Sequence, residues 1–213
     1  NCIVIAAGNR VTDRSVAYNM PKALANRLCH LEIKADPVAW HDWAVQRGLH
    51  RFVVGYLAYN PVALMRFDPS GTALAFPTPR SWEMVSSILT SVSEDIDAVF
   101  PLVAGCIGEE TARSLRTWSS LYGQLPTPEE IFAGTSAAKP KAEELRTALR
   151  SALVEYAGRH PEPEGLARSV EHACTLPWEY RKALLRDYSL MPSVTEALAA
   201  NPVFLDAVRD EEK

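Results

Sequence analysis

Two short apolar runs near the start of the chain predict β-strands. The first covers residues 2–7 and the second residues 29–33, and both have the length of a buried strand. Between them, Pro21 suits the start of a helix, so residues 22–28 predict a short one. The order strand, helix, strand is that of the last crossover of a parallel α/β sheet, although two strands alone are not a stable sheet.

After residue 36 the pattern predicts helices. A capping side chain directly precedes a proline at several points, which is typical of a helix start. The side chain accepts a hydrogen bond from a free amide, and the proline has no amide that needs a partner. The pairs are Asp36-Pro37, Asn60-Pro61, Thr78-Pro79, Thr127-Pro128 and Asn201-Pro202.

Two of these predicted helices have a clear apolar face. The helix from Lys141 repeats apolar residues at helical spacing, and the helix from Pro79 does so too. The predicted core positions are Leu145, Ala148, Leu149, Ala152, Leu153 and Tyr156 in the first, and Trp82, Val85, Leu89 and Val92 in the second. Trp40 and Trp43 lie three residues apart on another predicted helix and are expected in the core.

The expected architecture is therefore mainly α. It has a short α/β part over residues 1–35, followed by helices over residues 36–213. A buried strand needs neighbours on both sides, and nothing before residues 2–7 could supply one. We expect the chain to be the C-terminal piece of a longer protein.

Composition narrows the function only slightly. The 213 residues carry a formal charge of −4 and are 47% hydrophobic, which is ordinary for a globular protein. The acidic balance argues against a nucleic-acid partner, and no apolar stretch approaches the roughly 20 residues of a membrane span. The four cysteines are far apart, so zinc is not expected and reduced thiols in a cytoplasmic protein are the simplest interpretation.

Three polar residues are candidates for chemistry. Asn9 follows the first predicted strand, where α/β sheets bind ligands, although Gly-Asn is also ordinary turn chemistry. Arg27 ends the short helix and could contact phosphate, or could be a solvated helix end or a salt bridge. Arg80 lies in the first turn of a helix, where the dipole disfavours a cation, so its partner is either an anionic ligand or a carboxylate such as Glu83.

Several stretches together resemble the MoxR-like branch of the AAA+ ATPases. They are "AAGNR", "MPKALANRLCHLEI" and "FPTPRSWEMVSSIL", with "DPVAWHDWAVQRG" and "LPTPEEIF" as further similar stretches. The resemblance runs through most of the chain and is strongest up to residue 135. It implies that residues 1–35 are the end of an AAA+ α/β core, 36–103 an all-helical lid and 104–213 a C-terminal helical extension.

The resemblance also gives the three polar residues roles. Asn9 resembles sensor 1, which orients the attacking water, and Arg27 resembles the arginine finger, which reaches the nucleotide of the next subunit. Arg80 resembles sensor 2, which projects from the lid onto the phosphates. The phosphate-binding loop and the Walker B carboxylates are not in this sequence. ATP and Mg²⁺ are thus expected in the intact parent, and neither tight ATP binding nor hydrolysis is expected of these residues alone.

The implied partners are identical subunits in a ring, expected to be a hexamer, and a protein substrate that ATP hydrolysis remodels. A von Willebrand A domain protein is one candidate, whereas nucleic acid and membrane are not expected. The alternative is a non-catalytic helical module that binds a partner. A hydrolase with a site among His30, His41 and the serines is a third interpretation, but no nucleophile motif supports it.

Overall fold

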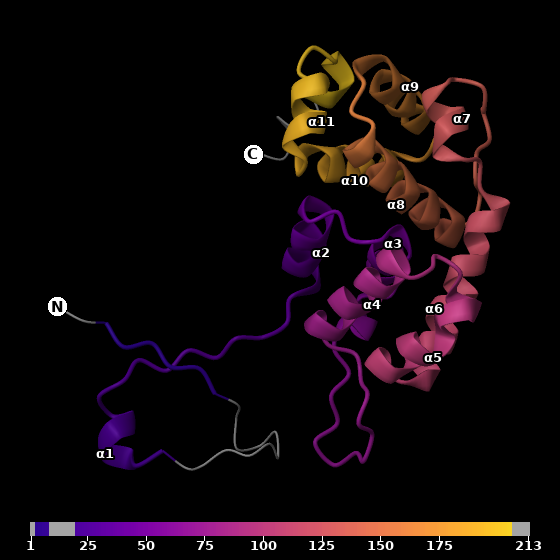
Figure 1. Cartoon of the computed structure of the whole chain (residues 1–213). Helices are drawn as coiled ribbons and strands as arrows, with labels where there is room; N and C mark the ends of the chain where they lie inside the picture. Colours follow the sequence, from indigo (N-terminus) through magenta and orange to yellow (C-terminus); the bar gives the residue numbers. More distant parts are fainter. Residues whose placement is uncertain (1–2, 9–19, 206–213) are drawn as a thin grey trace.

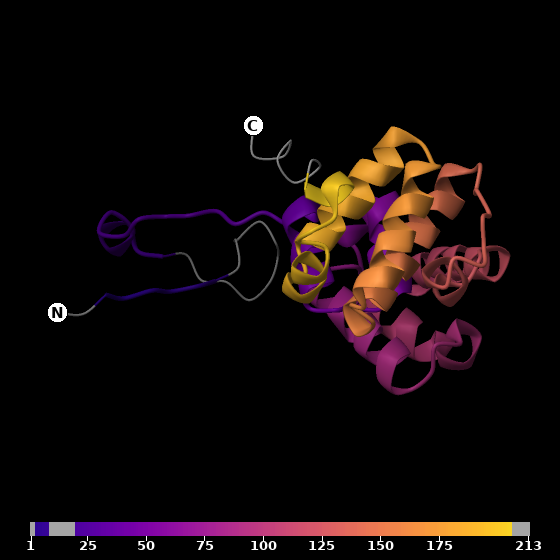
Figure 2. The same ribbon diagram turned by 90° about the horizontal axis from the view of Figure 1, so that it is seen from above.

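The computed structural model describes residues 3–8 and 20–205, which contain helices and no strand. Residues 3–8 and 20–36 form an extended segment, which we call the arm and which includes the short helix α1 (Lys22–Ala25). Residues 37–205 form the helical body. The arm lies to one side of the body in two perpendicular views (Figures 1 and 2).

The two predicted strands are wrong for the described residues. Residues 3–7 and 29–33 have no regular secondary structure, and Ile5 and Ile33 are 90% and 94% exposed. A strand exists only through hydrogen bonds to a neighbour, and the described part of the chain forms no sheet that these runs could join. The short helix between them is also smaller than predicted, because it ends at Ala25.

The helical body is mainly α, as the hydrophobic pattern predicted. Its first half contains α2 (Pro37–Gln46), α3 (Arg51–Tyr59), the 3-10 helix η2 (Pro61–Leu64), α4 (Pro79–Ser91), α5 (Ile96–Ile107) and α6 (Glu109–Ser119). Its second half contains the 3-10 helix η3 (Ser120–Gln124), α7 (Pro128–Phe132), α8 (Glu143–Arg159), α9 (Pro163–Cys174), α10 (Trp178–Ser189) and α11 (Pro192–Ala197). Residues 202–205 are helical as well.

The predicted helix starts are confirmed, one of them in altered form. The Asp36 carboxylate accepts hydrogen bonds from two amides of α2, and Asn201 does the same for residues 202–205. Thr78 and Thr127 each form a reciprocal capping box at the start of α4 and α7. Asn60 begins a 3-10 helix instead of an α-helix, and its side chain does not cap it.

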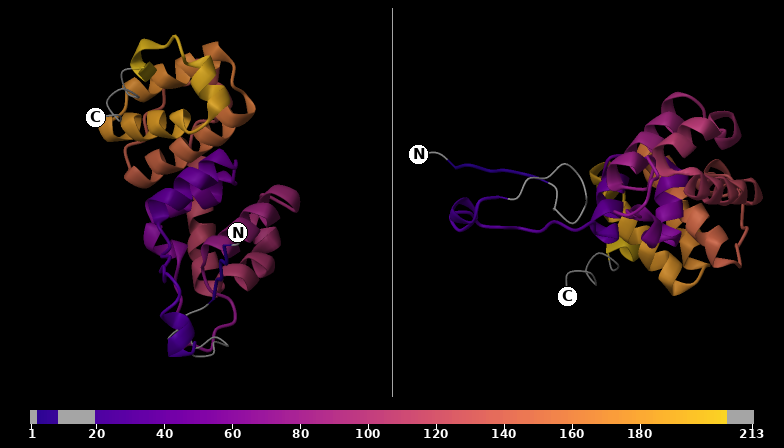
Figure 3. Two further views of the ribbon diagram at one scale, coloured as in Figure 1. Left: turned by 90° about the vertical axis from the view of Figure 1, so that its left-hand side faces the viewer. Right: turned by 90° about the horizontal axis from the view of Figure 1, so that it is seen from below.

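Helices α2 and α3 lie between two groups of helices. Helices α4 to α6 lie on one side, and α8 to α11 lie on the other (Figures 1 and 3). Helix α3 packs closely along α8. Gly55 permits this approach, because a Cβ there would overlap the side chain of Ser151. The body therefore has α3 at its centre.

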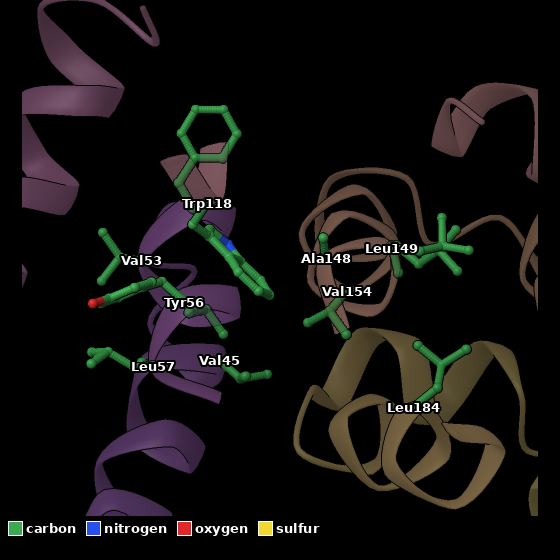
Figure 4. Close-up of a cluster of buried hydrophobic side chains, with 14 of the residues drawn as sticks. Val45, Val53, Tyr56, Leu57, Trp118, Ala148, Leu149, Val154 and Leu184 are labelled. Atoms are coloured by element: carbon green, nitrogen blue, oxygen red, sulfur yellow. The ribbon is translucent and has the colours of Figure 1, made fainter. Parts of the chain in front are cut away.

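A continuous apolar core runs from α3 across α8 to α10, and Figure 4 shows part of it, including Tyr56, Val154 and Leu184. In the predicted stripe of α8, Leu145 and Tyr156 are only partly buried and the other four residues are buried, Leu149 and Leu153 fully. The stripe of α4 is confirmed except at its end. Val92 is 64% exposed, because α4 stops at Ser91. No helix in the described ranges is long and apolar enough to cross a bilayer.

Candidate functional site

Arg80 occupies an unusual place for a cation. It is the second residue of α4, whose start is fixed by the capping box of Thr78 and Ser81. The first turn has no acidic residue, and Arg80 is exposed. Within the described part of the chain its guanidinium has no hydrogen bond and no ion pair, so the expected alternative partner Glu83 does not bind it. A free guanidinium at a helix start is suited to an anion.

The exposed face of α4 beyond Arg80 carries few charges. Met84, Ser87 and Ser91 follow Arg80 along one side of the helix and are all exposed, Met84 by 51%. The opposite side holds Trp82, which is fully buried and donates a hydrogen bond from its indole nitrogen to the carbonyl of Ala63 at 2.9 Å. This bond fixes the rotation of α4 about its axis, and with it the outward direction of Arg80.

Arg27 is found in the turn just after α1, in the arm. Its side chain is exposed and folds back onto its own helix, where Nη1 donates to the carbonyl of Ala23 at 3.0 Å. A cation at the carboxyl end of a helix is favourable, although α1 has only four residues. Because a single surface hydrogen bond holds it, Arg27 can turn toward another molecule at little cost.

The structure does not bring the three predicted site residues together. Asn9 lies outside the described residues. Arg27 belongs to the arm and Arg80 to the body, and α1 stands well apart from α4 in both Figure 1 and Figure 2. The convergence of all three on one nucleotide therefore stays a prediction.

Sequence reasoning missed a polar cluster where α2, α8 and α10 meet. Arg186 of α10 binds both carboxylate oxygens of Asp42 on α2, at 2.8 and 2.7 Å. Its neighbour Asp187 pairs with Arg150 of α8, with Oδ2 and Nε 3.2 Å apart, and lies 3.9 Å from Nδ1 of His41 on α2. We call these five residues the three-helix cluster.

Burial sets the electrostatics of this cluster. The Asp187 side chain is only 4% exposed, and burial raises the pKa of its carboxyl, against the opposing effect of Arg150. Burial also lowers the pKa of His41, while Asp187 opposes that shift. No local pattern indicates this cluster, because a His-Asp pair between Trp40 and Trp43 looks like ordinary helix surface.

A second polar group connects α3 to α4 and α8. His50 caps α3 by accepting a hydrogen bond at Nδ1 from the amide of Phe52, and its own amide donates to Ser86 of α4 at 2.8 Å. Burial, reinforced by neighbouring Arg51, lowers the pKa of His50 to about 4. Arg51 bridges Glu94 and the largely buried Glu155, at 2.8 and 3.3 Å.

Two cavities flank the contact between α2 and the C-terminal helices. One of about 230 Å³ lies beside the three-helix cluster, lined by Pro37, Val38 and Leu57 among others. The other, of about 300 Å³, lies among the end of α2, α8 and Met191. Neither Arg27 nor Arg80 lines either cavity.

No group of three or more potential metal ligands gathers among the residues that the structure describes. Cys29, Cys106 and Cys174 are free thiols, and Cys2 lies outside the described residues. Comparisons of the chain with family models, with curated proteins and with solved structures find no match. The candidate site is therefore defined by the geometry of this chain alone.

Proposed function

We propose that this chain is the C-terminal part of an AAA+ ATPase of the MoxR-like branch, which couples ATP hydrolysis to the remodelling of a protein partner. In this proposal residues 1–35 end the α/β core, residues 36–103 form the lid and residues 104–213 form the helical extension. Asn9, Arg27 and Arg80 act as sensor 1, arginine finger and sensor 2.

The observation that carries the proposal is the free guanidinium of Arg80. The capping box and the buried Trp82 hold α4 in one position, and Arg80 projects from it without a partner among the described residues. A cation at the positive end of a helix dipole costs stability unless an anion covers it. The phosphates of a nucleotide are such an anion, and they explain why arginine is tolerated here.

The arm supports the proposal from a second side. Its apolar runs have the composition of buried parallel strands, yet Ile5 and Leu31 are 90% and 84% exposed. Contiguous apolar side chains exposed in this way mark a surface that a partner covers. A nucleotide-binding sheet, formed by a segment outside these 213 residues, would bury them and would bring Arg27 to the surface of the core.

The residues present fit part of a nucleotide site. Bound ATP would supply a phosphoanhydride whose γ-phosphoryl group accumulates negative charge during transfer. Arg80 would hold the phosphates of its own subunit, and Arg27 would stabilise the transferring group in a neighbouring subunit, because positioned cations are most effective where charge develops. The sequence contains no phosphate-binding loop and the described residues no acidic cluster, so tight binding by this chain is not expected.

The proposal is tested on the longer protein that it requires. There, Arg27→Ala should abolish turnover while ATP still binds, because arginine fingers contribute roughly 10³ to 10⁵ in rate. The matched control is Arg113→Ala, an exposed arginine paired within α6 to Glu109, which should leave turnover unchanged. Unchanged turnover in the Arg27 variant, or a coding sequence without an upstream phosphate loop, would contradict the proposal.

The alternative is a non-catalytic helical module that binds a protein partner. The observation in its favour is that the helical body has a continuous core to which the arm contributes no buried residue. The two functions are distinguished by the coding sequence upstream of these residues, because a phosphate-binding loop before Asn9 favours the ATPase and its absence favours the module. Calorimetry of the 213-residue chain with ATP is a separate test of the ATPase proposal. Micromolar affinity would contradict the ATPase proposal as stated, since the chain would then bind nucleotide without the phosphate loop.

A further inference from the structure

The arm joins the body at α2, and charged side chains join α2 to the C-terminal helices. Asp36 both ends the arm and caps α2, so a displacement of the arm acts directly on this helix. Helix α2 packs its backbone closely against α3 and η2, and it reaches α10 through the three-helix cluster. A cavity of about 230 Å³ beside the cluster keeps apolar packing there incomplete.

Each ion pair in the cluster joins two different helices. The carboxylate of Asp42 on α2 pairs with Arg186 of α10. The carboxylate of Asp187, next to Arg186 on α10, pairs with Arg150 of α8. The Asp42 and Arg186 positions are 144 residues apart in sequence. Because the acidic and basic partners alternate among three helices, sliding or rotating any one helix separates at least one ion pair.

Burial makes these contacts stronger than ordinary surface pairs. The pair that joins α2 to α10, Asp42 and Arg186, is 27% and 33% exposed, and the pair that joins α10 to α8, Asp187 and Arg150, is 4% and 19% exposed. The side chains of Asp97 and Arg116, a pair within the first half of the body, are 74% and 48% exposed. Exposed pairs are screened by water and salt, and a buried pair that loses one partner leaves an uncompensated charge. The cluster therefore resists separation where the surface pair does not.

We propose that the three-helix cluster clamps α2 to α8 and α10, so that the arm's attachment point and the C-terminal helices move as one rigid body. Any partner that binds the arm then shifts α8 and α10 together with α2. Helices α5 and α6, on the far side of α3, carry no residue of the cluster. The inference goes beyond the proposed ATPase function, because it holds for any partner of the arm.

The test is amide hydrogen exchange on the full chain carrying Asp42→Asn. This side chain is 27% exposed, so the variant should fold. We expect exchange to become about tenfold faster in α2 and in α10, since a hydrogen-bonded charge pair is lost, and to stay unchanged in α5 and α6. The matched control is Asp97→Asn, which removes the exposed pair and should leave α2 and α10 unchanged.

The coupling must also be reciprocal, so Arg186→Gln should accelerate exchange in α2 as Asp42→Asn does in α10. The charge-exchanged double variant, Asp42→Arg with Arg186→Asp, should restore protection in both helices. The proposal is overturned by unchanged exchange in α10, by equal acceleration in α5 and α6, or by a double variant that recovers no protection.

Discussion

The arm and the helical body contain the same kinds of apolar side chain, but these side chains are exposed in the arm and buried in the body. Ile33 in the arm is 94% exposed, whereas Leu149 and Leu153 in the body are fully buried. The difference lies in what surrounds them. Each helix of the body finds another helix on its apolar face, and the arm finds no such surface in the described residues. An apolar pattern therefore shows that a segment has side chains to bury. Whether they are buried depends on a second segment or partner that packs against them.

The largest effect that separates the two regions is expected from truncating an apolar side chain in each. Leu149→Ala should lower the free energy of unfolding by about 2 to 5 kcal/mol, because it leaves a cavity between α8 and its neighbours. Ile33→Ala should change it by less than about 0.5 kcal/mol, because water already surrounds that side chain. Urea unfolding of both variants measures the two values. Similar losses would mean that the arm packs on the body in solution.

Acidification should destabilise the body through one of its buried histidines, whereas the described residues of the arm contain no buried side chain. His50 has its pKa lowered from 6.5 to about 4, so the unfolded chain binds the proton first as the pH falls. Its contribution of about 3 kcal/mol is complete above pH 6.5 and is lost on the way down to about pH 4. Protonation at Nδ1 would also remove the acceptor that caps α3.

The measurement is the free energy of unfolding against pH for the parent and for His50→Asn, which keeps a capping acceptor without titrating. The raised pKa values of Glu155 and Asp187 act in the opposite direction, so the difference between the two proteins isolates His50. An identical pH profile for His50→Asn would refute the assignment.

A smaller effect, of opposite sign, is expected at Arg80. Replacing a cation in the first turn of α4 by an anion, in Arg80→Glu, should raise the free energy of unfolding by about 0.3 to 1 kcal/mol. Arg27→Glu in the arm should leave unfolding of the body unchanged. A loss of stability in Arg80→Glu at low salt would indicate that a carboxylate pairs with Arg80 in solution.

Helices were predictable from this sequence because their signals are local. A capping residue before a proline fixes a start, and the spacing of Ala148, Leu149 and Leu153 fixes the buried face. Strands depend on segments far away or outside the chain, so the runs at 2–7 and 29–33 carried strand composition but not strand structure. Helix ends were also less certain, as Val92 shows.

In the candidate site, too, the residue with a local sequence signal was predictable and the residues brought together by distant contacts were not. Arg80 was found because a cation in the first helical turn is a local anomaly, and its exposed, unpaired state among the described residues agrees with that signal. The three-helix cluster was missed because its members lie in three separate stretches of sequence and are residue types that are common on protein surfaces. Only the packing of α2, α8 and α10 makes them neighbours. Spatial convergence of Asn9 with Arg27 and Arg80 equally depends on contacts that no local pattern encodes.

The smallest effect should come from removing the arm altogether. Residues 3–8 and 20–35 contribute no side chain to the buried core, so deletion of residues 1–35 should leave the thermal midpoint of the body unchanged within about 2 °C. Asp36 must be kept, because its carboxylate caps α2; the control that also carries Asp36→Ala should lose about 1 kcal/mol. A body that fails to fold without the arm would show that the arm takes part in the core. It would contradict the view that apolar side chains are buried only in the body. A body that folds unchanged would leave the apolar runs of the arm as surface available to another partner.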